Sequence, residues 1–254
     1  MAHQAPVAPV TVARDLRVAD LRAALAAGWG DFRAFPAYGL CFGALYVAAG
    51  LLIWFGLSQR GAEAWLIPAA GGFPILAPFV AVGIYEVSRR REAGLPIRWR
   101  AVLGALRGHG DDQILMMGGF VFVGFTFWII LAHGIFAIFL AQSGIGTESL
   151  ALLSTGSGLA MLLVGGAVGA VLALTFYAVT VISLPMLVDR EVDFLTAIIV
   201  SLATVRSNAG VMLAWAGFLA VLLSAAMLPA FLGLLIAMPV LGHATWHLYR
   251  RAVT

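Results

Sequence analysis

The amino-acid sequence predicts an all-helical, polytopic membrane protein with six transmembrane helices in three hairpins, each preceded by a short cytoplasmic interfacial helix. Composition, the apolar runs and the placement of the arginines predict this fold class. Of the 254 residues, 62% are hydrophobic and 11% are charged, whereas a soluble domain carries about 25% charged residues. A single aqueous core cannot bury so much apolar surface, so lipid must be the solvent for much of it.

Six apolar runs are long enough to cross a bilayer, which takes about 20 residues. They cover residues 36–57, 64–88, 114–141, 158–188, 210–228 and 229–249. The third and fourth runs exceed what a bilayer needs, so we expect them to tilt or to project beyond the lipid. The last two runs meet near Pro229, a residue that can begin a new helix after a tight turn.

The arginines predict the orientation of these spans. All 15 basic residues are arginine: four in the N-terminal segment, six in residues 89–113, two in residues 189–209 and two at the C terminus, against Arg60 alone elsewhere. Because cytoplasmic loops are rich in basic residues, both termini and the two long basic loops are predicted to be cytoplasmic. The basic face would then meet anionic headgroups of the inner leaflet.

The chain divides into a short tail and one membrane domain. Residues 1–13 are rich in Pro, Ala and Val and are predicted to be disordered, and residues 14–254 form a single six-span domain. An amphipathic segment precedes each odd-numbered span, and Asp193 is a candidate N-cap for the third of them. These segments and their spans make three repeat-like units, at about 18–91, 96–190 and 191–251. Both duplication and shared interface devices stay open as their origin.

Composition excludes several classes of function. The chain has no lysine, which excludes a P-loop lysine and a Schiff-base lysine. Its single cysteine, Cys41, excludes an intramolecular disulfide and a cysteine-rich metal site. No nucleic acid is expected as a partner.

Ionisable side chains inside a span are costly and are therefore candidates for function. His133 lies about 28 Å along its helix from the start of its run, at about 1.5 Å per residue, and so close to the outer face. The other candidates lie at the inner ends of the spans. Together with the boundary residue Asp189 they form a candidate polar cluster: Glu86, His243, His247 and Asp189.

Several roles for this cluster stay open. His243 and His247 lie four residues apart on one helical face, as a two-histidine metal site requires, and Glu86 or Asp189 could add a ligand. The histidines could equally handle protons or form structural hydrogen bonds, and Glu86 could pair with a neighbouring arginine. Haem is disfavoured, because two axial ligands must face each other across the iron. No cofactor is predicted, apart from lipids bound at the surface.

Other residues point to contact with the membrane and to helix packing. Aromatic and arginine side chains at the inner ends of the first and third units are typical of interface anchors: Tyr85, Arg89, Arg90, Trp246, Tyr249, Arg250 and Arg251. Small residues four apart predict close helix packing or dimerisation: Gly39 with Gly43, and Gly165 with Gly169. Prolines and glycines interrupt the second span at residues 67–78, as in transporters, although Pro78 and Pro239 could be plain kinks.

Three motifs carry a resemblance to a known family: GFPILAPFVAVGIYEVSRRREAG, SLPMLVDREVDFLTAI and PVLGHATWHLYRR. The chain resembles the bacterial predicted integral membrane proteins grouped as domain of unknown function 2189, over nearly its whole length after about residue 15. The resemblance implies a six-span protein of the bacterial inner membrane. It implies no catalytic or binding residues.

Three functional hypotheses follow. The leading one is a non-enzymatic accessory, assembly or interaction protein of a larger membrane complex, which fits the absence of nucleotide and redox motifs. The second is a small-molecule, ion or lipid translocator, and the third is an intramembrane metal-dependent protein that uses His243 and His247. The sequence favours a protein without enzymatic activity but leaves an enzyme open. The expected partners are the lipid bilayer with its anionic inner-leaflet headgroups, and a membrane protein or a second copy of the chain.

Overall fold

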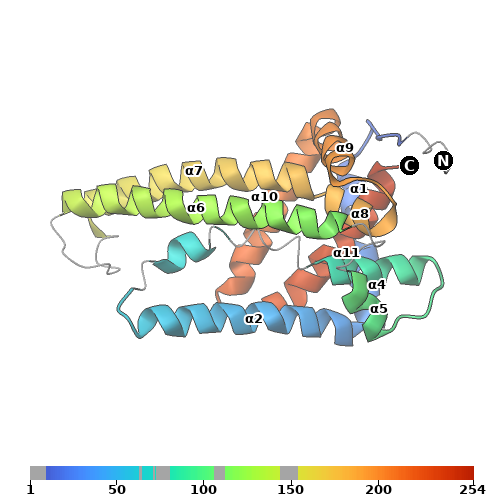
Figure 1. Ribbon diagram of the computed structural model, residues 1–254, viewed down its shortest axis with the longest axis horizontal. Helices are drawn as coiled ribbons and strands as arrows, with labels where there is room; N and C mark the ends of the chain where they lie inside the picture. The colour runs from blue at the N-terminus through green and yellow to red at the C-terminus, as the bar shows by residue number, and fades with distance from the viewer. Residues whose placement is uncertain (1–9, 63–64, 71, 73–80, 106–111, 144–153) are drawn as a thin grey trace.

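The computed structural model describes residues 10–62, 65–70, 72, 81–105, 112–143 and 154–254. Within these ranges the protein is helical throughout, as predicted, and its one strand-like contact is an antiparallel bridge between Val12 and Val253. Residues 66–70 are helical. The named helices are α1 (Val18–Ala34), α2 (Pro36–Ser58), α4 (Val82–Glu92), α5 (Trp99–Gly104), α6 (Gln113–Ser143), α7 (Gly156–Thr180), α8 (Ser183–Asp189), α9 (Phe194–Ser207), α10 (Ala209–Met227) and α11 (Leu234–Ala252) (Figure 1).

Four helical stretches among the described residues are long and apolar enough to cross a membrane: Pro36–Ser58, Gln113–Phe139, Gly156–Asp189 and Ala209–Met227. They match four of the six predicted runs. The run at 64–88 falls partly outside the described residues, and Pro78 with it. The sixth predicted run forms α11, which is not one of the four, because its two histidines and two arginines make it more polar than a typical span. The structure therefore shows several apolar helices but does not establish six spans.

The fourth predicted run is broken near its C-terminal end. Here α7 ends at Thr180 and α8 begins at Ser183, with Pro185 as the third residue of α8. A proline ring clashes with the carbonyl four residues earlier, which here belongs to Val181, so the break lies where helix geometry requires it.

Helices form at all three predicted amphipathic segments, as α1, α5 and α9. The side chain of Asp193 accepts a hydrogen bond from the Thr196 backbone N–H at 2.8 Å. This contact satisfies one of the free N–H groups at the start of α9, and it confirms the predicted N-cap.

The short helices α1, α4, α5, α8 and α9 gather with both termini at one end of the molecule, from which α2, α6 and α7 extend (Figure 1). The termini lie side by side: the backbone N–H groups of Thr11 and Ala13 donate to the carbonyls of Thr254 and Ala252, both at 2.9 Å. The described part of the predicted tail is thus paired with the C terminus rather than disordered, and residues 1–9 lie outside the described ranges.

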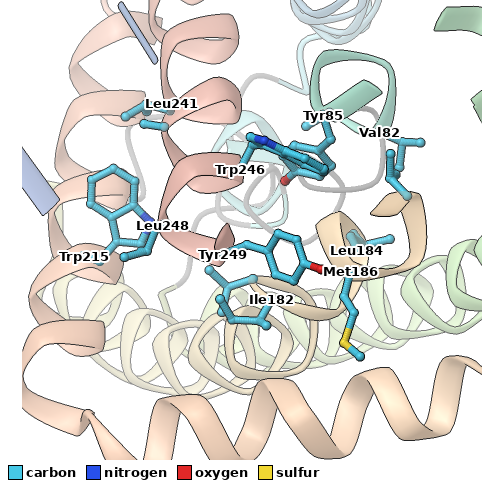
Figure 2. Close-up of a cluster of buried hydrophobic side chains, with 14 of the residues drawn as sticks. Val82, Tyr85, Ile182, Leu184, Met186, Trp215, Leu241, Trp246, Leu248 and Tyr249 are labelled. Atoms are coloured by element: carbon cyan, nitrogen blue, oxygen red, sulfur yellow. The ribbon is translucent and has the colours of Figure 1, made fainter. Parts of the chain in front are cut away.

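The best-packed core also lies at this end. Trp215, Trp246 and Tyr249 are among its largest fully buried side chains, and residues of α4, α8 and α11 surround them (Figure 2). In contrast, the four candidate spans bury only 11–28% of the residues in their most apolar stretches. Most of their surface is therefore available to lipid.

Glycines set the closest helix contacts. A Cβ at Gly39 would lie 2.8 Å from Pro239, and one at Gly43 would lie 2.8 Å from the backbone of Leu235, so both glycines bring α2 against α11. A Cβ at Gly169 would lie 2.8 Å from Trp128 of α6. Gly165 is different, because its nearest atom, on Ile135, would be 3.9 Å away.

We expect Gly28→Ala to weaken the contact of α1 with α11. Its Cβ would lie 2.5 Å from the backbone N of Ala244 and 2.8 Å from the carbonyl O of Val240, so a helix backbone would have to shift. Overpacking of this kind costs about 1–3 kcal/mol. Chemical unfolding of the protein in mild detergent measures this loss of stability.

The control is Gly30→Ala on the same helix, where the nearest atom is the Arg91 side chain at 3.8 Å. At an open position in a helix, replacing glycine with alanine raises the free energy of unfolding by up to about 1 kcal/mol. Equal stability of the two variants would contradict the proposed contact.

Candidate functional site

Three helices bring polar side chains together beside the crossing of α1 and α11. Because α11 passes directly over Gly28, Asp31 on the next turn of α1 faces His243 and His247, which lie one turn apart on α11. Ser88 and Arg91, three residues apart on α4, reach the same carboxylate. We call Asp31, Ser88, Arg91, His243 and His247 the Asp31 cluster.

The Asp31 carboxylate accepts three hydrogen bonds. The Arg91 guanidinium donates to Oδ1 at 2.5 Å, and Oδ2 accepts from the Ser88 hydroxyl at 2.5 Å and from His247 Nε2 at 2.9 Å. His243 Nδ1 lies 2.7 Å from the Ser88 oxygen. Since the single hydroxyl proton of Ser88 goes to the carboxylate, His243 must donate from Nδ1, which leaves its Nε2 as an acceptor. This Nε2 is buried and has no partner among the described residues.

The Asp31 cluster runs from the protein interior to its surface. Asp31, Ser88 and His243 are 4%, 1% and 0% exposed, whereas the side chains of His247 and Arg91 are 24% and 41% exposed. Burial raises the pKa of the Asp31 carboxyl, but the hydrogen bonds from His247 and Ser88 and the electrostatic influence of the two histidines lower it by more, so this pKa lies below its usual value. The buried group is therefore a carboxylate at neutral pH.

Asp31, the carboxylate beside both histidines, is not a member of the predicted polar cluster. Glu86 instead accepts from Arg89 Nε at 2.7 Å and from Arg90 Nε at 2.6 Å on its own helix, which is the arginine pairing that the sequence had left open. Glu86 thus lies in separate ion pairs with Arg89 and Arg90.

Asp189 belongs to a second network, on another side of α11. It accepts from the Tyr249 hydroxyl at 2.7 Å and from Arg250 Nη1 at 2.9 Å. Glu92 of α4 accepts from Trp246 Nε1 and from Arg250 Nε, both at 3.0 Å. The structure therefore does not bring Asp189 to the histidines.

The predicted aromatic anchors lie inside the protein. Tyr85, Trp246 and Tyr249 are 2%, 1% and 0% exposed, so their rings pack on other helices rather than on lipid headgroups (Figure 2). Arg251 is more exposed, and it donates to Asp15 and Asp20 near the N terminus at 3.1 and 3.2 Å. The aromatic and arginine pattern at the end of α11 thus reflects tertiary packing.

The described side chains are poorly arranged to bind a metal ion. The described residues contain no group of three or more His, Cys, Asp or Glu side chains arranged to hold one. In the Asp31 cluster the guanidinium of Arg91 already occupies Oδ1 of the carboxylate and would repel a cation. His133 stacks on Trp65 with ring centroids 5.1 Å apart and takes no part in the cluster.

Two cavities lie among the membrane helices, and both are apolar. One, of about 320 Å³, lies between α7, α10 and α11, and the other, of about 380 Å³, lies between α6, α7 and the segment at Ile67 and Pro68. No carboxylate, arginine or histidine of the described chain lines either cavity. The charged networks and the cavities are therefore separate features.

Sequence reasoning missed Asp31, Ser88, Arg91 and Glu92. Asp31 sits in the first amphipathic segment, where an acidic residue is ordinary on an interfacial helix. The sequence distinguishes Asp31 only by its place one helical turn after Gly28. This spacing indicates a contact with α11 only once α11 is known to cross α1 at Gly28.

Comparison with known proteins supports the membrane assignment. Residues 66–189 match the family model described as predicted integral membrane protein (DUF2189), which confirms the family resemblance over that stretch. The motif PVLGHATWHLYRR lies outside the matched residues. No curated protein and no solved structure matches the chain. The chain is thus an integral membrane protein with several apolar helices.

We expect Asp31→Asn to destabilise the protein by about 2 kcal/mol, because a neutral amide accepts weaker hydrogen bonds from Arg91, Ser88 and His247 than a carboxylate does. Asparagine keeps the size of the side chain, so a loss of stability would come from the lost charge and not from a cavity. Chemical unfolding in mild detergent measures it.

Asp15→Asn is the matched control. The Asp15 side chain is 68% exposed and pairs with Arg251, and an exposed ion pair of this kind is worth about 0–1 kcal/mol. If Asp31→Asn costs no more than this control, the cluster does not stabilise the fold.

Proposed function

We propose that this protein is a non-enzymatic accessory, assembly or interaction protein of a larger complex in the bacterial inner membrane. One observation carries the proposal: three carboxylates at the polar end of the molecule are engaged in hydrogen bonds within the chain. Asp31, Glu86 and Asp189 each accept hydrogen bonds from two or more groups of the same chain. An enzyme needs a reactive group beside a substrate cavity, and the two cavities are lined by neither carboxylates nor histidines.

The proposed membrane arrangement has six spans with both termini in the cytoplasm. Fourteen of the 15 arginines support it through the positive-inside rule. The pairing of Val12 with Val253 also supports it, because an even number of crossings returns the chain to its starting side. In this arrangement α11 is the sixth span, and its polar end lies within the cytoplasmic layer of short helices.

Partners would bind the membrane helices. The α6–α7 hairpin packs mainly on itself and reaches the rest of the molecule chiefly through α8 and α9 (Figure 1). Its outer faces present large apolar side chains, among them Phe122, Ile130 and Leu163, which are 65%, 63% and 67% exposed. Aliphatic and aromatic surface of this extent suits either lipid or another membrane helix.

A translocator of apolar molecules is the second candidate function. The two cavities favour it, because they lie among the membrane helices and are lined almost entirely by apolar side chains. The same lining argues against a path for ions, which need polar groups to replace their water. The metal-dependent alternative loses support from the guanidinium on Asp31.

Single-cysteine labelling tests the orientation. In a Cys41→Ser background, we expect Arg60→Cys to react with a membrane-impermeant maleimide in intact spheroplasts, and Ser207→Cys to react only after permeabilisation. Both positions are exposed, so access depends on the side of the membrane. The reverse labelling pattern would refute cytoplasmic termini.

Photo-crosslinking in cells tests the interaction role. We expect a photoreactive residue at Phe122 or Leu163 to give one protein adduct of constant mass, because these positions face a partner helix. Leu228, which is 85% exposed just after α10, provides the control. Lipid adducts alone at the hairpin, together with a chain that purifies without a stoichiometric partner in mild detergent, would contradict the proposal. An adduct of twice the chain mass would identify the partner as a second copy.

A further inference from the structure

Two adjoining cavities run along α7, and we call them together the groove. Both are lined by Ala170 and Ala173, so they adjoin at this part of the helix. Together their linings on α7 extend from Met161 in one cavity to Tyr177 in the other. At about 1.5 Å per residue, this part of α7 is about 24 Å long. The groove therefore extends through much of the membrane.

Small residues keep the groove open. Gly166 lines the cavity beside α6, and Gly217 of α10 lines the cavity beside α11. A Cβ built at either glycine would meet no atom within 4 Å. Both walls thus leave free space where an ordinary side chain would project.

The dimensions suit one hydrocarbon chain. The volumes of about 320 and 380 Å³ lie within the usual range of ligand sites, about 300–1,000 Å³. Apolar cavities exclude water and take up apolar molecules, and in a membrane the acyl chains of the surrounding lipids are the nearest.

Positive charge near one end of the groove indicates which kind of lipid headgroup would lie there. Tyr85 lines the groove, and Arg89 follows it by one turn on the same face of α4. Arg89 and Arg90 share the single carboxylate of Glu86, so a net positive charge remains, and their side chains are 25% and 21% exposed. An anionic headgroup would balance this charge.

We infer that the groove along α7 binds one acyl chain of an anionic phospholipid, whose headgroup lies beside Arg89 and Arg90. This is a defined site between helices, distinct from the lipid that covers the outer surface. Phe122, Ile130 and Leu163 do not line the groove, so these positions of the α6–α7 hairpin stay free for a partner.

Gly217→Leu tests the site. A Cβ at this position would meet no atom within 4 Å, so we expect the variant to fold. We expect the affinity for phosphatidylglycerol, titrated into delipidated protein in detergent and followed by native mass spectrometry, to fall at least about tenfold. Displacing two methylene groups from an apolar site has an effect of this size. Gly166→Leu should act in the same way in the other half of the groove.

Gly210→Leu is the matched control, because Gly210 lies on the same helix with equally open space but does not line the groove. It should retain about one phosphatidylglycerol per chain, like the unaltered protein. Unchanged binding in both folded groove variants would overturn the site. If the protein bound phosphatidylcholine as tightly as phosphatidylglycerol, the assignment of an anionic headgroup would be wrong. If the groove held an apolar molecule without phosphorus, the assignment of a phospholipid would be wrong.

Discussion

The carboxylate of Asp31 is the interaction on which the arrangement of α1, α4 and α11 depends. A buried charge must be paired and hydrogen-bonded, and the partners of this one come from two other helices. The three helices can satisfy it only in one relative rotation. Gly28 makes that rotation possible, because its missing side chain lets α11 approach until its backbone nearly touches α1.

This constraint separates the molecule into two parts. At one end, the polar groups of α11 bond to α1, α4 and α8 around a dense aromatic core. Away from it, the apolar helices bury little of their surface within the chain. The polar end therefore holds the structure together, and the apolar end is free to contact lipid or other membrane helices. A role in association follows more naturally from this division than catalysis does.

Helix α7 shows how one helix can serve two kinds of contact. Its alanines and glycines line the groove and leave room for a hydrocarbon chain. Other positions carry large side chains such as Leu163 and Val171, which do not line the groove and are 67% and 65% exposed. A bound chain would fill the space between α7 and α10 and so would support the hairpin from within.

Composition and local pattern by themselves determined that the chain is a helical membrane protein, where most of its helices lie and that Asp193 caps α9, because hydropathy and capping act over a few neighbouring residues. The same local view placed Tyr85, Trp246 and Tyr249 at the membrane interface and grouped the histidines with Glu86 and Asp189. Only the tertiary structure decided that these rings are buried, that Asp31 is the carboxylate beside both histidines, and that α7 borders a groove. The physical reason is that burial and charge pairing depend on which helices cross, and the crossing of α1 and α11 joins residues more than 200 positions apart.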